Sequence, residues 1–138
     1  MHDKKSIAII GMSCRFPGAD NPDSFWKLLS NGENMITEIG SERWNLESFF
    51  DPNPTTPNKS YQRHGAFLER IDDFDPLLFN ISPAEAIEMA PSQKLMIELT
   101  WEAIEQSRQP YNKVTNGKVV VFIGNIWNDF EHVRKHLN

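Results

Sequence analysis

Ser6-Ile7-Ala8-Ile9-Ile10-Gly11 and Val119-Val120-Val121-Phe122-Ile123-Gly124 decide the expected fold class, because both are short β-branched apolar runs that end at a glycine. A strand covered on one face alternates apolar and polar residues, whereas a strand covered on both faces is apolar throughout. Both runs are therefore predicted to be buried strands that share one parallel or mixed sheet. Helices must cover the two faces of such a sheet, so the expected class is α/β.

Helical signals lie between the two runs. Asn21-Pro22 supplies an N-cap and a proline at the first helical position, and Asn31-Gly32 supplies a C-terminal stop, which predicts a short packed helix. Ser82-Pro83-Ala84-Glu85 has capping-box spacing and predicts a short helix that is interrupted at Pro91. A longer helix is expected over residues 91–107. Apolar residues cover most of its circumference, so it needs neighbours on more than one side.

Two further segments have clear local signals. Three prolines within residues 51–59 preclude regular structure and predict an extended surface loop. Asn128 and Glu131 have N-cap and N3 spacing, which predicts a terminal helix from Asn128. There is no internal repeat and no linker long enough to separate two domains, so the 138 residues are expected to form one domain at most.

Composition excludes several classes of protein. The formal net charge is 14 − 19 = −5 without any Lys/Arg cluster, which makes nucleic acid a poor partner. The longest apolar run, residues 119–123, is far shorter than the roughly 20 residues that cross a bilayer, so no membrane span is expected. Residues 1–5 do not resemble a signal peptide, and the single cysteine, Cys14, fits a reducing compartment. The expected location is the cytoplasm.

Few side chains are candidates for chemistry. Cys14 is the only possible thiolate nucleophile, but no histidine lies near it in the sequence, and we interpret it as a small buried or half-buried hydrophobe. The turn from Gly11 to Gly18 lacks the G-x-G-x-x-G spacing of a dinucleotide-binding turn. No G-x-S-x-G elbow or phosphate-binding glycine loop is present. From the residues alone, no activity is visible.

Acidic and histidine clusters have simpler interpretations than metal or acid–base sites. Asp72, Asp73 and Asp75 lack the central glycine and the final glutamate of an EF-hand loop, which favours a solvated acidic turn. His132 and His136 have a spacing that can hold zinc, but no third ligand is evident, so we interpret them as surface histidines. Helical spacing explains three further carboxylates, Glu98, Glu102 and Glu105, as a solvent or partner face.

A series of motifs runs in one order along nearly the whole chain. The opening run and loop of residues 7–18 are followed by Phe25-Trp26-Lys27-Leu28-Leu29, by Arg63-His64-Gly65-Ala66-Phe67-Leu68, by residues 79–86 and by residues 89–98. Together they resemble the N-terminal part of a β-ketoacyl synthase, specifically the ketosynthase domain of modular polyketide synthases. Several motifs in register are more specific than any one of them. The chain departs from the family at Ala90, Ser92 and Lys94, where the family usually has Asp, Gln and Arg.

The resemblance implies an incomplete thiolase-like fold, namely the N-terminal portion of a layered α/β/α/β/α architecture that is usually homodimeric. It also implies a decarboxylative condensation of acyl thioesters held on the phosphopantetheine of an acyl carrier protein. In that family a cysteine accepts the acyl group and two histidines assist the condensation. No cofactor bound to this chain itself is expected.

The same resemblance implies that residues 1–138 end before the catalytic cysteine and both histidines. Cys14 matches a cysteine of the opening loop and His64 a histidine of the front loop, so we expect no catalytic, cofactor-binding or metal-binding residue. The chain is then not catalytic by itself and would need the remaining ketosynthase polypeptide. Without that polypeptide, large apolar patches of this chain would face water. The alternatives are a non-catalytic docking module for a carrier protein or synthase subunit, and a remnant without a role.

Overall fold

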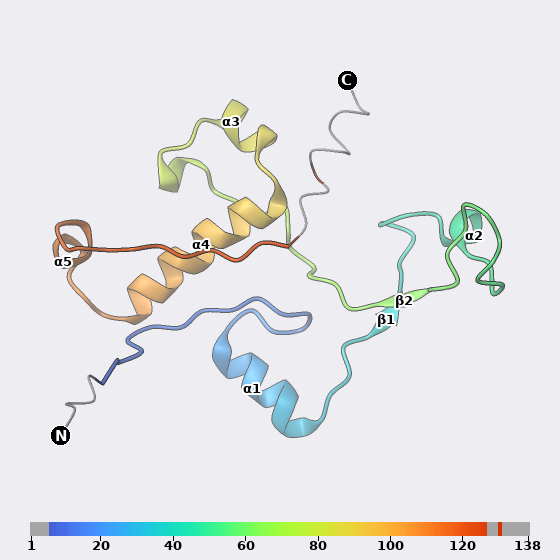
Figure 1. Ribbon diagram of the computed structural model, residues 1–138, viewed down its shortest axis with the longest axis horizontal. Helices are drawn as coiled ribbons and strands as arrows, with labels where there is room; N and C mark the ends of the chain where they lie inside the picture. Colours follow the sequence, from blue (N-terminus) through green and yellow to red (C-terminus); the bar gives the residue numbers. More distant parts are fainter. Residues whose placement is uncertain (1–5, 127–129, 131–138) are drawn as a thin grey trace. The chain divides into compact units, whose positions relative to one another are not determined.

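The computed structural model describes residues 6–126 and residue 130, so most of the helix predicted from Asn128 lies outside the described residues. The chain divides into two compact units, one of residues 14–69 and the other of residues 1–13 and 70–138. Figure 1 shows the elements in chain order. They are α1 (Pro22–Asn31), β1 (Thr37–Glu38), α2 (Leu46–Phe49), β2 (His64–Gly65), the 3-10 turn η1 (Leu77–Phe79), α3 (Pro83–Glu88), α4 (Pro91–Gln106) and α5 (Tyr111–Thr115).

Helix α1 of the 14–69 unit confirms the helix predicted between Asn21 and Gly32. The Asn21 side chain accepts a 2.9 Å hydrogen bond from the Ser24 N–H, and the Ser24 hydroxyl accepts a 3.2 Å bond from the Asn21 N–H. Pro22 occupies the first helical position, where a missing N–H costs nothing. Gly32 ends the helix in the left-handed conformation, with φ 65°, which glycine adopts without a steric penalty.

The same unit contains the single sheet found among the described residues, a two-stranded antiparallel pair of β1 and β2. Glu38 lies opposite His64, and the Arg63 Nε donates a 2.8 Å hydrogen bond to the Glu38 carboxylate. The proline-rich residues 51–59 form turns and no helix or strand, as predicted. The short strands were not predicted, because two-residue strands carry no periodic signal.

Helix α4 is the longest element of the other unit and begins at Pro91, as predicted from the proline. Ala90, just before it, has no side-chain acceptor, and its N–H instead donates a 2.9 Å hydrogen bond to the Gln93 side chain. Helix α3 precedes this break, and the Ser82 hydroxyl caps it by accepting a 3.2 Å bond from the Glu85 N–H. The predicted pair of helices separated at Pro91 is therefore confirmed. Helix α5 was not predicted.

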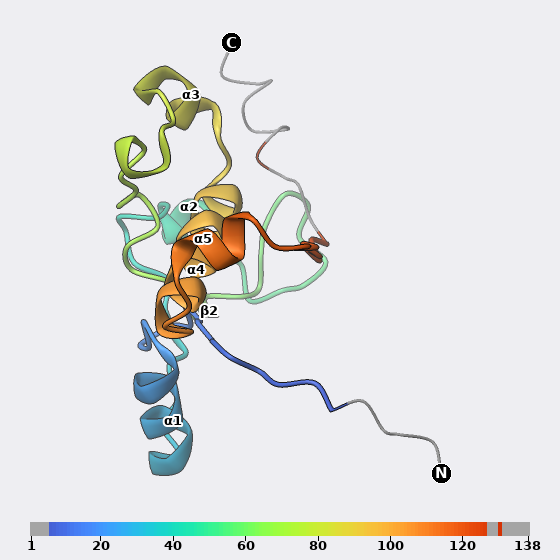
Figure 2. The same cartoon turned by 90° about the vertical axis from the view of Figure 1, so that its left-hand side faces the viewer.

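The prediction that residues 6–11 and 119–124 share a sheet is wrong for this chain. Both segments are extended, but neither is paired as a strand. Figures 1 and 2 draw both segments as coil without a strand arrow. Their side chains face solvent, and the extremes are Ile7, 94% exposed, and Phe122, 92% exposed. A strand exists only through its hydrogen-bonded neighbours, and within the described residues these two segments have none.

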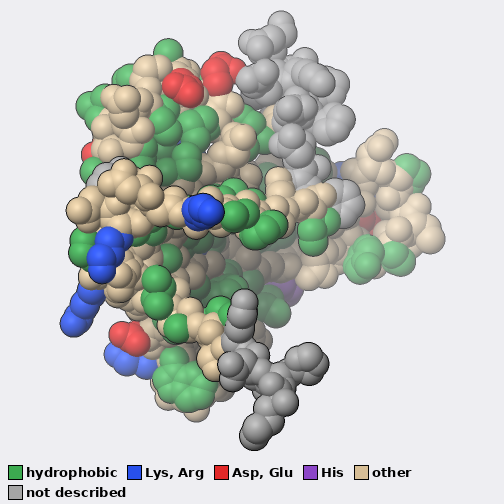
Figure 3. Space-filling view, turned by 60° about the vertical axis from the view of Figure 1, so that its left-hand side comes forward, with side chains coloured by type: hydrophobic (Ala, Val, Ile, Leu, Met, Phe, Trp, Pro, Cys, Tyr) green, Lys and Arg blue, Asp and Glu red, His purple; other side chains and the backbone are tan. Residues whose placement is uncertain are grey.

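Burial is sparse in both units. Among the described residues only four hydrophobic side chains are buried, namely Ala19, Ile39, Ala86 and Ala90. Aromatic pairs provide local packing instead: Phe16 stacks on Phe25 with centroids 4.1 Å apart, and Phe79 meets Trp101 edge-on at 6.2 Å. Figure 3 shows hydrophobic side chains exposed on one face of the molecule. None of the helices in residues 6–126 has the length and hydropathy of a membrane span.

Candidate functional site

In the unit of residues 1–13 and 70–138, residues 11–13 cross α4 at close range. A Cβ on Gly11 would lie 2.0 Å from the Ala103 carbonyl oxygen, so only glycine permits this approach. The Met12 N–H donates a 2.6 Å hydrogen bond to the Gln106 side chain. The Ser13 hydroxyl donates a 2.6 Å bond to the Leu99 carbonyl. Sequence reasoning missed this crossing, although the glycine after the apolar run was a signal for it.

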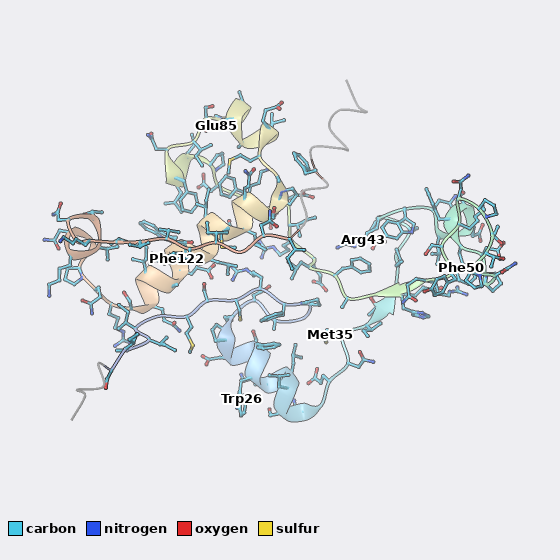
Figure 4. All side chains as sticks on the ribbon, in the orientation of Figure 1. Trp26, Met35, Arg43, Phe50, Glu85 and Phe122 are labelled. Atoms are coloured by element: carbon cyan, nitrogen blue, oxygen red, sulfur yellow. The ribbon has the colours of Figure 1, made fainter. Side chains whose placement is uncertain are left out.

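Two apolar grooves lie along α4. The larger has a volume of about 860 Å³ and is bounded by residues 10–13, by the α4 face that holds Leu99 and Ala103, and by Val114 and Val119. The smaller, about 480 Å³, lies between Met89, Ile97 and Ile123. Figure 4 shows the extended segment with Phe122 beside α4. Aliphatic side chains form much of both linings, which suits an apolar partner.

Cys14 and His64 both lie in the 14–69 unit. Cys14 is half-buried in the opening loop, where its backbone carbonyl accepts a 3.2 Å hydrogen bond from the Arg15 guanidinium. His64 lies exposed on β2, opposite Glu38. The half-buried position of Cys14 agrees with its interpretation as a small hydrophobe.

The aspartates of residues 72–75 form an exposed acidic turn, as predicted. The Asp75 carboxylate accepts a 3.1 Å hydrogen bond from the Leu77 N–H and so caps η1, and the Arg70 guanidinium pairs with Asp73. Among the residues that the structure describes, no group of three or more His, Cys, Asp or Glu side chains could hold a metal ion. His132 and His136 lie outside those residues.

Lys94, Glu98, Glu102 and Glu105 recur at helical spacing along α4, and they are only partly exposed to solvent. Glu105 is exposed, as expected, but Lys94, Glu98 and Glu102 are half-buried. Interactions already occupy Glu98 and Glu102, so they are not an unpaired carboxylate couple suited to acid–base chemistry.

The family model "Beta-ketoacyl synthase, N-terminal domain" matches residues 4–137. The chain therefore belongs to the β-ketoacyl synthase family and corresponds to its N-terminal domain. More specifically, it is the N-terminal part of a polyketide synthase ketosynthase domain, as its relatives show. The mycocerosic acid synthase-like polyketide synthase of Mycobacterium tuberculosis is 38% identical over 125 residues. The mycoketide-CoA synthase of the same organism is 45% identical over 103 residues.

The chain spans only a small part of these relatives. The match to the first covers 90% of this chain and 6% of the relative, and the match to the second covers 73% and 2%. The erythronolide synthase EryA3 of Saccharopolyspora erythraea is 43% identical over 86% of this chain and 4% of its own length.

Solved ketosynthases have the same fold where they match. An oxazolomycin ketosynthase domain of Streptomyces albus has a TM-score of 0.67 and 33% identity, over 71% of this chain and 17% of that chain. The ketosynthase from module 6 of the bacillaene synthase of Bacillus subtilis has a TM-score of 0.65 and 38% identity, over 71% and 16%. These likenesses confirm the predicted class, a partial thiolase-like fold.

Proposed function

We propose that this chain is the N-terminal scaffold of a ketosynthase that condenses acyl units carried as thioesters on the phosphopantetheine of an acyl carrier protein. The family match over residues 4–137 is the observation that carries this proposal. The likeness to ketosynthases of the oxazolomycin and bacillaene systems supports it. The phosphopantetheine belongs to the carrier protein, so the chain itself needs no resident cofactor. The proposed location of the reaction is the cytoplasm.

The reactive groups of this ketosynthase lie, in the proposal, on the polypeptide that follows the matched segment. Cys14 lies half-buried in the opening loop, and the family resemblance matches it to the cysteine of that loop rather than to the nucleophile. His64 is exposed on the two-residue strand β2. Residues 1–138 therefore do not catalyse the condensation alone. The proposed partners are the remaining ketosynthase polypeptide and the carrier protein, with the family's homodimer as the assembly.

The exposed apolar segments agree with a scaffold that is completed by further chain. Residues 6–10 and 119–123 have the composition of strands buried on both faces, yet they face solvent here. Their burial would transfer several large aliphatic side chains out of water, at roughly 1.5–3 kcal/mol for each fully buried residue. That gain is available to a polypeptide that covers them.

Acylation measured by intact-protein mass tests the proposal on the chain as it exists. The purified chain, incubated at pH 7 with an acyl thioester of N-acetylcysteamine, is expected to gain no stoichiometric acyl mass. A Cys14→Ser variant is the matched control and should behave identically. Stoichiometric acylation that disappears in this control would assign the nucleophile to Cys14 and contradict the proposal.

Docking without chemistry is the second candidate, and the apolar groove of about 860 Å³ beside α4 favours it. Calorimetric titration with a phosphopantetheinylated carrier protein separates the two candidates. Binding by the chain alone, together with failure to support acylation when combined with the remainder of a ketosynthase, would favour docking. Acylation that occurs when the chain is combined with the remainder of a ketosynthase would favour the scaffold function.

A further inference from the structure

The chain contains two Asn-Gly pairs, Asn31-Gly32 and Asn116-Gly117. An asparagine before a glycine is chemically labile, because the glycine nitrogen has no bulky neighbour and can attack the asparagine side-chain carbonyl to close a five-membered succinimide ring. Both pairs lie at the C-terminal end of a helix, the first at the end of α1 and the second directly after α5, and all of these residues are exposed. Exposure therefore does not distinguish the two pairs, but their hydrogen bonds do.

Helix α1 protects the first pair. The Gly32 N–H donates a 3.2 Å hydrogen bond to the Leu29 carbonyl and ends the helix. The side-chain amide of Asn31 donates a 3.0 Å bond to the Glu33 carboxylate. Ring closure requires the peptide between Asn31 and Gly32 to rotate until the glycine nitrogen faces the asparagine Cγ. That rotation would break the bonds that end α1, so it is opposed in the folded chain.

The second pair lacks these restraints. The Asn116 N–H donates a 3.1 Å bond to the Asn112 carbonyl, which fixes only the peptide before the reactive one. Among residues 6–126, neither the Gly117 N–H nor the Asn116 side chain has a hydrogen-bond partner. Residues 118–126 continue as extended chain that is not paired as a strand. The peptide between Asn116 and Gly117 can therefore rotate without the loss of a hydrogen bond of its own.

We propose that Asn116 is a site of spontaneous deamidation. The Gly117 nitrogen forms a bond to the Asn116 Cγ and gives its proton to solvent, while the bond from Cγ to the side-chain nitrogen breaks and that nitrogen leaves, protonated by solvent, as ammonia. Water then opens the succinimide at either carbonyl and yields aspartate or isoaspartate. One water is consumed and one ammonia is released, so no oxidant, reductant or cofactor is required.

Either product changes the chain just before the exposed segment of residues 119–123. Aspartate and isoaspartate each add a negative charge beside Lys118, and isoaspartate also lengthens the backbone by one carbon between α5 and that segment. This inference does not depend on the proposed function, because it concerns the reactivity of one peptide bond.

Peptide mapping by mass spectrometry tests the site in the full folded chain, incubated at mildly alkaline pH, with an isoaspartyl methyltransferase used to label isoaspartate. Asn116 is expected to deamidate at least about tenfold faster than Asn31, which is its matched control within the same molecule. Asn116→Gln should abolish the reaction at this position, because its ring closure needs six members, and Asn31→Gln should leave the rate at Asn116 unchanged. Equal rates at the two pairs, or a faster reaction at Asn31, would overturn the proposal.

Repeating the mapping in guanidinium chloride separates the folded structure from the neighbouring charges. Lys118 follows the second pair and Glu33 follows the first, and these neighbours are present in the folded and the unfolded chain alike. Unfolding removes the hydrogen bond of Gly32, so the reaction at Asn31 should accelerate and the ratio of the two rates should fall. A ratio that stays the same in the denaturant would assign the difference to the neighbouring charges and would contradict the proposal.

Discussion

The Ser13 hydroxyl donates a 2.6 Å hydrogen bond to the backbone carbonyl of Leu99, 86 residues further along the chain. Together with the contact of Gly11 on Ala103, this bond fixes the end of the first apolar run against the middle of α4. Little else in the unit is buried, so a few contacts of this kind carry a large share of its order.

Gly11→Ala is expected to loosen this crossing. The added Cβ would meet the Ala103 carbonyl at 2.0 Å, and backbone must move to accept it. Forcing atoms into a filled space costs typically about 1–3 kcal/mol. Hydrogen exchange of the α4 amides should therefore accelerate. Gly124→Ala is the control, since its Cβ would meet nothing within 4 Å; equal acceleration in both variants would disprove the steric explanation.

Ser13→Ala removes the hydroxyl that reaches Leu99, at an expected cost of about 1 kcal/mol in the stability of the crossing. Hydrogen exchange at residues 99–107 is the measurement. Ser13→Thr keeps a hydroxyl and should preserve most of the protection. Protection that is unchanged in Ser13→Ala would show that the bond contributes nothing.

Ala90→Asp is expected to stabilise α4. Ala90 is the N-cap residue without a side-chain acceptor, and an aspartate there can accept from the Ser92 N–H and share the Gln93 N–H, which now donates a 2.9 Å bond to the Ala90 carbonyl. The gain should be about 1 kcal/mol, seen as increased helical circular dichroism and a higher urea midpoint. Ala84→Asp, within α3, is the comparison and should leave α4 unchanged. A lower urea midpoint in Ala90→Asp would contradict this prediction and would mean that the space around the buried Ala90 side chain does not accommodate a carboxylate.

Asn21→Ala should destabilise α1 by about 1 kcal/mol, because the amide oxygen accepts from the Ser24 N–H at 2.9 Å. Asn21→Asp retains the acceptor and should retain the helix. The amide exchange of residues 22–31 reports both variants. Equal exchange rates in the two variants would contradict a capping role for Asn21.

The Arg63–Glu38 pair between the strands should contribute little. Both side chains are about half exposed, and exposed pairs are worth about 0.2–1 kcal/mol and less at high salt. A double-mutant cycle with Arg63→Met and Glu38→Gln measures the coupling. A coupling above about 2 kcal/mol would show that solvent screening has been overestimated here.

The sequence predicted those elements whose signals are local. Asn21, Pro22 and Gly32 bound α1, and Pro91 starts α4, because capping and proline chemistry act within one turn. The prediction that residues 6–11 and 119–124 form a sheet was wrong, because strands depend on partners that periodicity does not reveal. Strands β1 and β2 are too short to show a pattern.

The same difference between local and long-range signals decides which features of the candidate site could be predicted. The exposed acidic turn and the half-buried Cys14 were predictable from spacing and residue type. The crossing at Gly11 was not, because it joins residues about 90 positions apart and only the folded backbone brings them together. The ketosynthase assignment came from whole motifs rather than from periodicity, and the match over residues 4–137 confirms it.

The scaffold role is tested most directly by exchanging the N-terminal segment of the Bacillus subtilis bacillaene module 6 ketosynthase for this chain and measuring acylation by intact mass. Its controls are the host with its own segment and the host lacking the segment. We expect the exchanged enzyme to melt cooperatively and to gain one acyl group per chain, whereas the host without the segment gains none. An exchanged enzyme that melts cooperatively but stays unacylated would contradict the scaffold role.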